Sequence, residues 1–184
     1  MNIPEDMPQK AMELTNKYFC EDHNNCAESV FRSLMTVTGQ DCPIEVLKMA
    51  SPFGRGMGEA GCACGALVGG QMAIGVFFGR ESTKGFPPNL CAEAAKALHK
   101  RFVKSNGAAC CRILHKGLPF GTDEQFSACC KRAVDAAEIA ATLIRDIKEN
   151  YTNSEMDLFE VLRIAKKKRA ESRDGNSSEE GGES

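Results

Sequence analysis

Apolar side chains recur at helical spacing along most of the chain. Between residues 7 and 20 they fall three or four positions apart, which is the repeat of one face of an α-helix. Asn25 and Glu28 form a capping pattern in which each side chain bonds the other residue's backbone amide, so a second helix is expected over residues 26–37. A short helix is expected over residues 43–50, because its first residue is proline, which suits a first helical turn.

Glycines interrupt this pattern between Gly54 and Gly61, where four of eight residues are glycine. Such a density resists regular structure and marks a tight loop in which the backbone comes close to another group. Residues 64–78 are then almost wholly apolar, with small residues among them. They predict a buried helix that neighbouring helices can approach closely, and one too short for the roughly 20 apolar residues that a bilayer requires.

The second half of the chain predicts further helical segments. Thr122 and Gln125 form another capping pattern at the start of the longest one, on which Cys130 and Val134 share the expected core face. Residues 170–184 are rich in Ser, Gly and Glu and hold no large apolar side chain, so a disordered tail is expected. The helical segments are expected over residues 90–103, 108–115, 122–149 and 153–169.

The predicted fold is all-α, a compact bundle of about five to seven helices with a glycine-rich loop and a disordered C-terminal tail. Composition agrees, because a chain with 7% aromatic residues and no Trp favours close-packed helices over a sheet. Its 184 residues suit one ordinary core. The expected organisation is a cysteine-rich redox domain over residues 1–152, a C-terminal helix over 153–169 and the tail over 170–184.

The net charge and the first residues of the chain limit the kinds of partner that the protein is expected to have. The formal net charge is -2, which provides no field to attract nucleic acid or anionic lipid. Residues 1–9 carry acids and prolines in place of a basic start and an apolar stretch, so no secretory signal is expected. A cytoplasmic protein with neither a nucleic-acid nor a membrane partner is therefore predicted.

The composition includes ten cysteines, and this high number requires an explanation. A reducing compartment disfavours disulfides, and metal binding or redox chemistry is then the leading explanation. Free cysteine is also among the most buried residue types, and Cys20, Cys42 and Cys91 are expected to be simply small buried side chains.

Two cysteines stand where a thiolate would be stabilised. Cys26 and Cys64 both fall at expected helix starts, where free N–H groups and the helix dipole favour negative charge. Amides of the glycine-rich loop would be further donors to cluster sulfurs. Spacing alone matches no ferredoxin, zinc-ribbon or haem-attachment pattern, since the chain has no Cys-x-x-Cys pair. The three histidines are scattered, and surface or structural roles are expected for them.

Five short segments carry a resemblance. Together they resemble a family of redox-active proteins of the C_GCAxxG_C_C type, named for one cysteine, the CGAxxG motif and two later cysteines. The likeness covers roughly residues 8–148. The segments are Asn-Cys-Ala-Glu-Ser-Val at 25–30, Phe-Gly-Arg-Gly-Met-Gly at 53–58, Cys-Gly-Ala-Leu-Val-Gly at 64–69, Cys-Arg-Ile-Leu at 111–114 and Cys-Lys-Arg-Ala-Val at 130–134.

That resemblance implies an iron-sulfur cluster whose ligands are Cys26, Cys64, Cys111 and Cys130. A related domain accompanies haem in split-Soret cytochromes and looks like a 2Fe-2S carrier, which favours that cluster here and leaves 4Fe-4S or zinc open. The chain also has cysteines beside three of the four positions, and these are secondary candidates. Neighbouring side chains on a helix diverge by about 100°, so neighbours are not expected to share one iron. The secondary candidates are Cys62, Cys110 and Cys129.

The leading functional hypothesis is a one-electron carrier that works with a redox partner protein, rather than a stand-alone enzyme, since no convincing catalytic acid or base is present. A first alternative is thiol-disulfide chemistry by Cys62 and Cys64. A second alternative is a structural zinc site in an interaction module. Helices rich in Ala and Gly would also permit a homodimer.

Overall fold

The computed structural model describes residues 3–40, 42–84, 89–151 and 158–176, and within them the backbone is helical apart from its connections and one isolated bridge between Ala63 and Cys110. The all-α prediction is confirmed. Helices outnumber the five to seven expected, because three single-turn helices lie in segments between the longer ones. The helices are α1 (Met7–Cys20), α2 (Cys26–Val37), α3 (Ile44–Lys48), α4 (Gly54–Met57), α5 (Gly65–Phe78), α6 (Asn89–Asn106), α7 (Cys111–Leu114), α8 (Asp123–Asn150) and α9 (Leu158–Asn176), with a 3-10 turn at Ser51–Phe53.

The chain divides into two units, one up to Ile144 and one from Arg145 onward. In the second unit, the amine of Lys168 on α9 donates to the side-chain oxygen of Asn150 at the end of α8, over 2.7 Å. α9 continues to Asn176, past the expected helix end at residue 169. The expected boundary at residues 152–153 and residues 177–184 of the expected tail lie outside the described residues.

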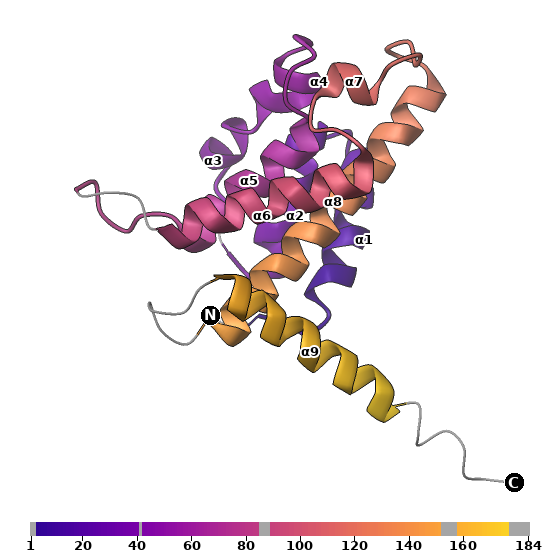
Figure 1. Ribbon diagram of the computed structural model, residues 1–184. Coiled ribbons are helices and arrows are strands. Elements are labelled where there is room, and N and C mark those ends of the chain that lie inside the picture. The colour runs from indigo at the N-terminus through magenta and orange to yellow at the C-terminus, as the bar shows by residue number, and fades with distance from the viewer. Residues whose placement is uncertain (1–2, 41, 85–88, 152–157, 177–184) are drawn as a thin grey trace, which may run out of the picture. The chain divides into compact units, whose positions relative to one another are not determined.

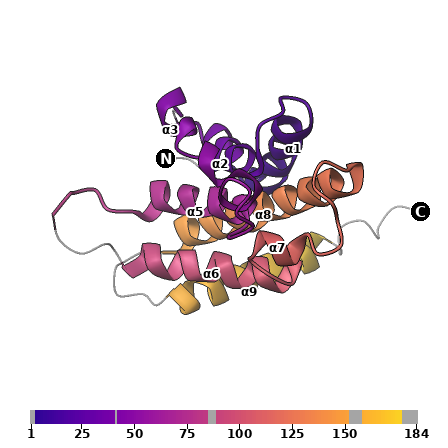
Figure 2. The same cartoon turned by 90° about the horizontal axis from the view of Figure 1, so that it is seen from above.

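In the first unit α5 lies between α2 and α6, and α1 packs on α2 (Figures 1 and 2). The fully buried side chains of this unit come from several of these helices and include Phe31, Leu34, Ile74, Leu98 and Phe102. Among the described residues, none of the helices combines the length and the apolar character needed to cross a bilayer.

Glycines let these helices approach closely, as expected for the segment 64–78. A Cβ atom added at Gly69 on α5 would lie 2.4 Å from the carbonyl oxygen of Ala27 and 3.1 Å from Cβ of Val30, both on α2. A Cβ at Gly70 would meet Leu98 of α6 at 3.0 Å and Ala140 of α8 at 3.5 Å. The two neighbouring glycines thus set the distances from α5 to three other helices.

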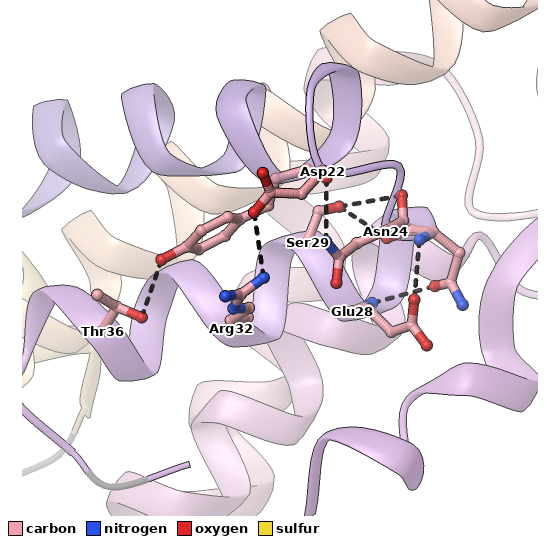
Figure 3. A network of polar contacts seen from close by, with 8 residues as sticks. Asp22, Asn24, Glu28, Ser29, Arg32 and Thr36 are labelled. Atoms are coloured by element: carbon pink, nitrogen blue, oxygen red, sulfur yellow. Dashed lines mark hydrogen bonds and ion pairs between the residues drawn. The ribbon is translucent and has the colours of Figure 1, made fainter. Parts of the chain in front are cut away.

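The start of α2 is fixed by the predicted capping box (Figure 3). The side-chain oxygen of Asn25 accepts from the amides of Ala27 at 2.9 Å and Glu28 at 3.1 Å, and the Glu28 carboxylate accepts from the Asn25 amide at 2.9 Å. One turn further on, the Arg32 guanidinium lies 4.1 Å from the centre of the Tyr18 ring of α1. These contacts hold the first turn of α2 in place, and Cys26 is its first residue.

Candidate functional site

Cysteine side chains from four separate segments line one cavity of about 540 Å³. Its wall also carries His115, Gln125 and Arg132. Three of the predicted ligands therefore share one site, and the fourth cysteine on its wall is a secondary candidate in place of Cys130. The cavity cysteines are Cys26 at the start of α2, Cys64 directly before α5, Cys111 at the start of α7 and Cys129 on α8.

The sulfur of Cys26 is held against the first turn of α5. A Cβ atom at Gly65 would lie 2.5 Å from Cys26 Sγ and 2.6 Å from the carbonyl oxygen of Phe53. Both contacts are far inside van der Waals distance, so only glycine leaves room for the thiol here. The backbone amide of Arg55, in the glycine-rich loop, lowers the pKa of the Cys26 thiol against the effect of burial.

Cys64 occupies the N-cap position of α5, with extended backbone angles. No side-chain capping hydrogen bond forms at this position. The backbone amides of Leu67 and Ala66 nevertheless lower the pKa of the Cys64 thiol against the effect of burial. They belong to the first helical turn, whose N–H groups have no partner inside the helix, and they would stabilise a thiolate there.

Cys111 is positioned by a short antiparallel contact between two loops. Its amide donates to the carbonyl of Cys62 at 2.6 Å, and the amide of Cys64 donates to the carbonyl of Ala109 at 2.8 Å. Gly56 lies against Cys111 with φ of +70°, and a Cβ atom there would be 2.4 Å from Cys111 Cβ and 3.0 Å from its sulfur. The tight loop expected around Gly54–Gly61 is therefore the surface on which Cys111 rests.

Cys129 lies on α8 between two polar side chains. Gln125 donates its amide to Cys129 Sγ at 3.1 Å, and His115 Nε2 lies 3.2 Å from the same sulfur. Two buried nitrogens of the cavity residues, His115 Nδ1 and Arg132 Nη1, have no hydrogen-bond partner among the described residues. Buried polar atoms are rarely left unpaired in native proteins. Two residues of the cavity wall therefore each hold a buried nitrogen that lacks a partner among the described residues.

Burial raises the pKa of every cavity thiol. The pKa of Cys26 rises from 9.0 to about 12, through burial and then the nearby Cys64, and that of Cys111 rises to about 11 for the same two reasons. Burial also raises the pKa of Cys64, although the backbone amides of Leu67 and Ala66 lower it. Burial likewise raises the pKa of Cys129, although the hydrogen bond from Gln125 lowers it. A cation binding these sulfurs must displace their protons.

A single metal ion and a cluster place different demands on their protein ligands. Among the described residues, no three side chains of His, Cys, Asp or Glu lie close enough together to hold one metal ion. A lone zinc ion would need sulfurs about 2.3 Å from one centre. A cluster instead places its ligand sulfurs on different irons, around a group of several atoms. A thiol-lined cavity fits the second requirement.

Residues 24–143 match the family described as putative redox-active protein (C_GCAxxG_C_C). The match spans well over half of the chain. The chain belongs to this family. No curated protein and no solved structure shows a significant match to it. It is thus a cysteine-rich, all-helical member of a redox-active family.

The CGAxxG motif of this C_GCAxxG_C_C protein has a separate physical role at each fixed position. Cys64 contributes a cavity thiol, and Gly65 makes space for the sulfur of Cys26. Ala66 is buried and also lines the cavity. Gly69 lies one turn further along α5 and lets the backbone of α2 come close. The motif therefore joins two helices and brings two thiols to one cavity.

Cys130 lies away from the cavity thiols. Its sulfur is 3.1 Å from the sulfur of Cys20 at the end of α1, and it donates to Oδ1 of Asn16 at 3.2 Å. Burial and then the hydrogen bond with Cys20 raise the pKa of Cys130 to about 12. The structure thus brings Cys130 together with Cys20 and does not bring it to Cys26, Cys64 and Cys111.

The remaining cysteines take different positions. Cys62 is exposed, whereas its proposed exchange partner Cys64 is buried on the cavity wall. The thiol of Cys110 donates to the carbonyl of Gly61 at 3.2 Å. Cys20, Cys42 and Cys91, expected to be buried, are each half-buried.

Two cavity residues, Cys129 and His115, were not leading candidates from the sequence. Cys129 is followed at helical spacing by the fully buried Ala133, Ala136 and Ala140. The positions that follow Cys130 include the equally buried Ala137, Ala141 and Ile144, although Val134 is half-buried. Helical spacing alone therefore does not choose between the two cysteines. His115, expected at the surface or in a structural role, lies on the cavity wall beside Cys129, and no motif marked it.

Proposed function

We propose that this chain holds an iron-sulfur cluster in the cavity and exchanges single electrons with a partner protein. The observation that supports it best is the convergence of four cysteine thiols from distant segments on one cavity. When bound, such a cluster supplies one-electron redox chemistry. A 2Fe-2S cluster is favoured, by the likeness to the split-Soret domain.

In this proposal the ligands are Cys26, Cys64, Cys111 and Cys129. The thiols lose their protons on loading, because thiolate is the binding form. Around them the chain supplies N–H groups that favour the thiolate charge. Backbone amides lower the pKa of Cys26 and of Cys64, and the side-chain amide of Gln125 donates to the sulfur of Cys129. Donors of this kind shift a reduction potential.

Arg132 gives the cavity a fixed positive charge. One arm of its guanidinium donates to the carbonyl of Leu114 at 2.7 Å, and the other is the buried Nη1 without a partner. Arginine stays protonated at any working pH. It therefore partly offsets the negative charge of bound thiolates and favours the reduced state. In this role Arg132 tunes the site without being a ligand.

A redox partner protein, a cytoplasmic location and a possible homodimer belong to the same proposal. Ten cysteines in a chain whose core is large enough to fold without disulfides suit a reducing compartment. An electron carrier without a catalytic acid or base needs a donor and an acceptor to act on.

The test is anaerobic reconstitution of the full chain with iron and sulfide, followed by iron and sulfide analysis and by visible and EPR spectra. We expect a coloured protein with matched iron and acid-labile sulfide. A colourless protein with all ten thiols free would contradict the proposal. One zinc without sulfide would select a zinc module, and one defined disulfide between Cys62 and Cys64 without iron would select thiol-disulfide chemistry.

Two neighbouring variants identify the fourth ligand. Cys129→Ser should lose most of the iron and the visible spectrum, because Cys129 lines the cavity. Cys130→Ser, one residue further along the same helix, is the matched control and should keep both. The opposite result would restore Cys130 as the ligand and overturn the assignment drawn from the cavity.

A further inference from the structure

Cys20 and Cys130 form a second pair of thiols outside the cavity. Their sulfurs are 3.1 Å apart, although 110 positions separate the residues along the chain. A disulfide bond is about 2.05 Å long, so the sulfurs need to approach by only about 1 Å. Neither residue lines the cavity. The pair is therefore a site of its own.

An aromatic contact next to the two thiols holds the end of α1 against α8. Phe19, next to Cys20, stacks on Phe126 with ring centres 4.9 Å apart, and Phe126 lies one helical turn before Cys130 on α8. The end of α1 is thus fixed against α8 by a contact that involves neither sulfur. The closeness of the thiols follows from how the two helices pack.

Asn16 determines which way the thiol hydrogens of the pair point. Its side-chain oxygen accepts from Cys130 Sγ at 3.2 Å, and Cys20 Sγ lies 3.7 Å from the same oxygen. A thiol has a single hydrogen, so when Cys130 donates to Asn16, Cys20 is the donor across the 3.1 Å between the sulfurs. The reduced pair is therefore satisfied by hydrogen bonds within the protein.

We propose that Cys20 and Cys130 are a reversible dithiol-disulfide couple that exchanges electrons with disulfide substrates, such as glutathione disulfide or a partner protein's disulfide. Both residues are half-buried, so a substrate sulfur can reach the pair. One thiolate attacks the substrate disulfide, forming a mixed disulfide and releasing one thiol. The second thiolate then attacks the bonded cysteine sulfur and releases the other substrate thiol.

The exchange is balanced without another reactant. The two cysteines lose two electrons and two protons, and the substrate disulfide gains both as two thiols. The reverse reaction, with two substrate thiols, restores the dithiol. The product bond would join the end of α1 to α8 and close a long loop, which limits the freedom of the unfolded chain.

The test uses the full chain, purified anaerobically and incubated in glutathione buffers of increasing oxidation. Free thiols are alkylated after an acid quench, and the digest is analysed by mass spectrometry without reduction. We expect one cross-linked peptide joining Cys20 to Cys130, reversed by dithiothreitol, together with a higher denaturant midpoint for unfolding of the oxidised chain. Cys20→Ser should lose the cross-link. Cys91→Ser, which alters another half-buried cysteine, should keep it.

Iron content separates this proposal from the proposed function. Cys20→Ser should bind as much iron as the unaltered chain, and the cross-link should form whether or not the cavity is loaded. Loss of iron from Cys20→Ser would assign the pair to the metal site and overturn the inference. So would alkylation of both thiols in buffers that oxidise other cysteines of the chain. Failure of reconstitution alone would count against the cluster and leave the couple intact.

Discussion

Gly69→Ala should destabilise the protein strongly. The new Cβ would lie 2.4 Å from the carbonyl oxygen of Ala27, whereas an ordinary contact begins near 3.4 Å, so α5 and α2 must separate by about 1 Å. Overpacking a core generally costs about 1–3 kcal/mol. We expect the upper end, about 3 kcal/mol, because the opposing atom is backbone and cannot rotate away.

Gly75→Ala is the matched control on the same helix. A Cβ at Gly75 meets nothing within 4 Å, and the position is exposed. Replacing a helical glycine by alanine there should stabilise the protein by about 0.5–1 kcal/mol. The two variants should therefore differ by nearly 4 kcal/mol, close to a thousandfold in the folding equilibrium.

Urea unfolding followed by circular dichroism measures this difference. For a denaturant slope of about 2 kcal/mol/M, the midpoint of Gly69→Ala should fall by roughly 1.5 M and that of Gly75→Ala should rise slightly. Equal midpoints for the two variants would refute the claim that Gly69 sets the distance between α2 and α5. A rise for both would show that propensity alone governs these positions.

Three further outcomes are expected. Gly56→Ala should lower iron uptake with little loss of helix, because the new Cβ would displace Cys111. Metal analysis measures the uptake and circular dichroism the helix content. Unchanged uptake would show that the loop does not position the Cys111 thiol. Iron affinity should fall as pH falls, because Cys26, with a pKa of about 12, and Cys111, with a pKa of about 11, must lose their protons to bind. Titration calorimetry in buffers of different ionisation enthalpy should detect the released protons. Iron binding without proton release would contradict this prediction. Burial and then Arg132 lower the pKa of His115. Its contribution to stability is therefore present above the unfolded pKa of about 6.5 and is lost as pH falls through the folded value. The urea midpoints measured near pH 5 and pH 7 should differ less for His115→Gln than for the unaltered chain.

Local signals in the sequence were sufficient for most of the helices. The capping box at Asn25 forms as predicted, because its partners lie within one helical turn. The second pattern forms only in part. Thr122 accepts from the amide of Gln125 at 3.2 Å, but the Gln125 side chain accepts from the amide of Gly121 and donates to Cys129. Other local contacts, four residues before and four residues after Gln125, thus use a side chain that the pattern assigned to the cap.

The fourth cysteine shows where sequence reasoning ends. Cys129 and Cys130 differ by one residue, or about 100° around α8, and each lies among apolar positions at helical spacing. The segment beginning at Cys130 carried the family resemblance. Fully buried alanines follow both cysteines, Ala133 and Ala140 in phase with Cys129 and Ala137 and Ala141 in phase with Cys130, so helical spacing does not choose between them. Which sulfur reaches the cavity depends on how α8 packs in three dimensions.

The wide separation of the cavity thiols along the chain also orders events during biosynthesis. Positions from 26 to 129 must come together, and closing such long loops in an unfolded chain is entropically costly. An ion arriving early would meet only neighbours such as Cys110 and Cys111, whose side chains end in different places. If the proposed cluster is bound, productive loading would therefore follow folding. The folded apoprotein, rather than the nascent chain, would then be the species on which a cellular supply of iron and sulfide acts.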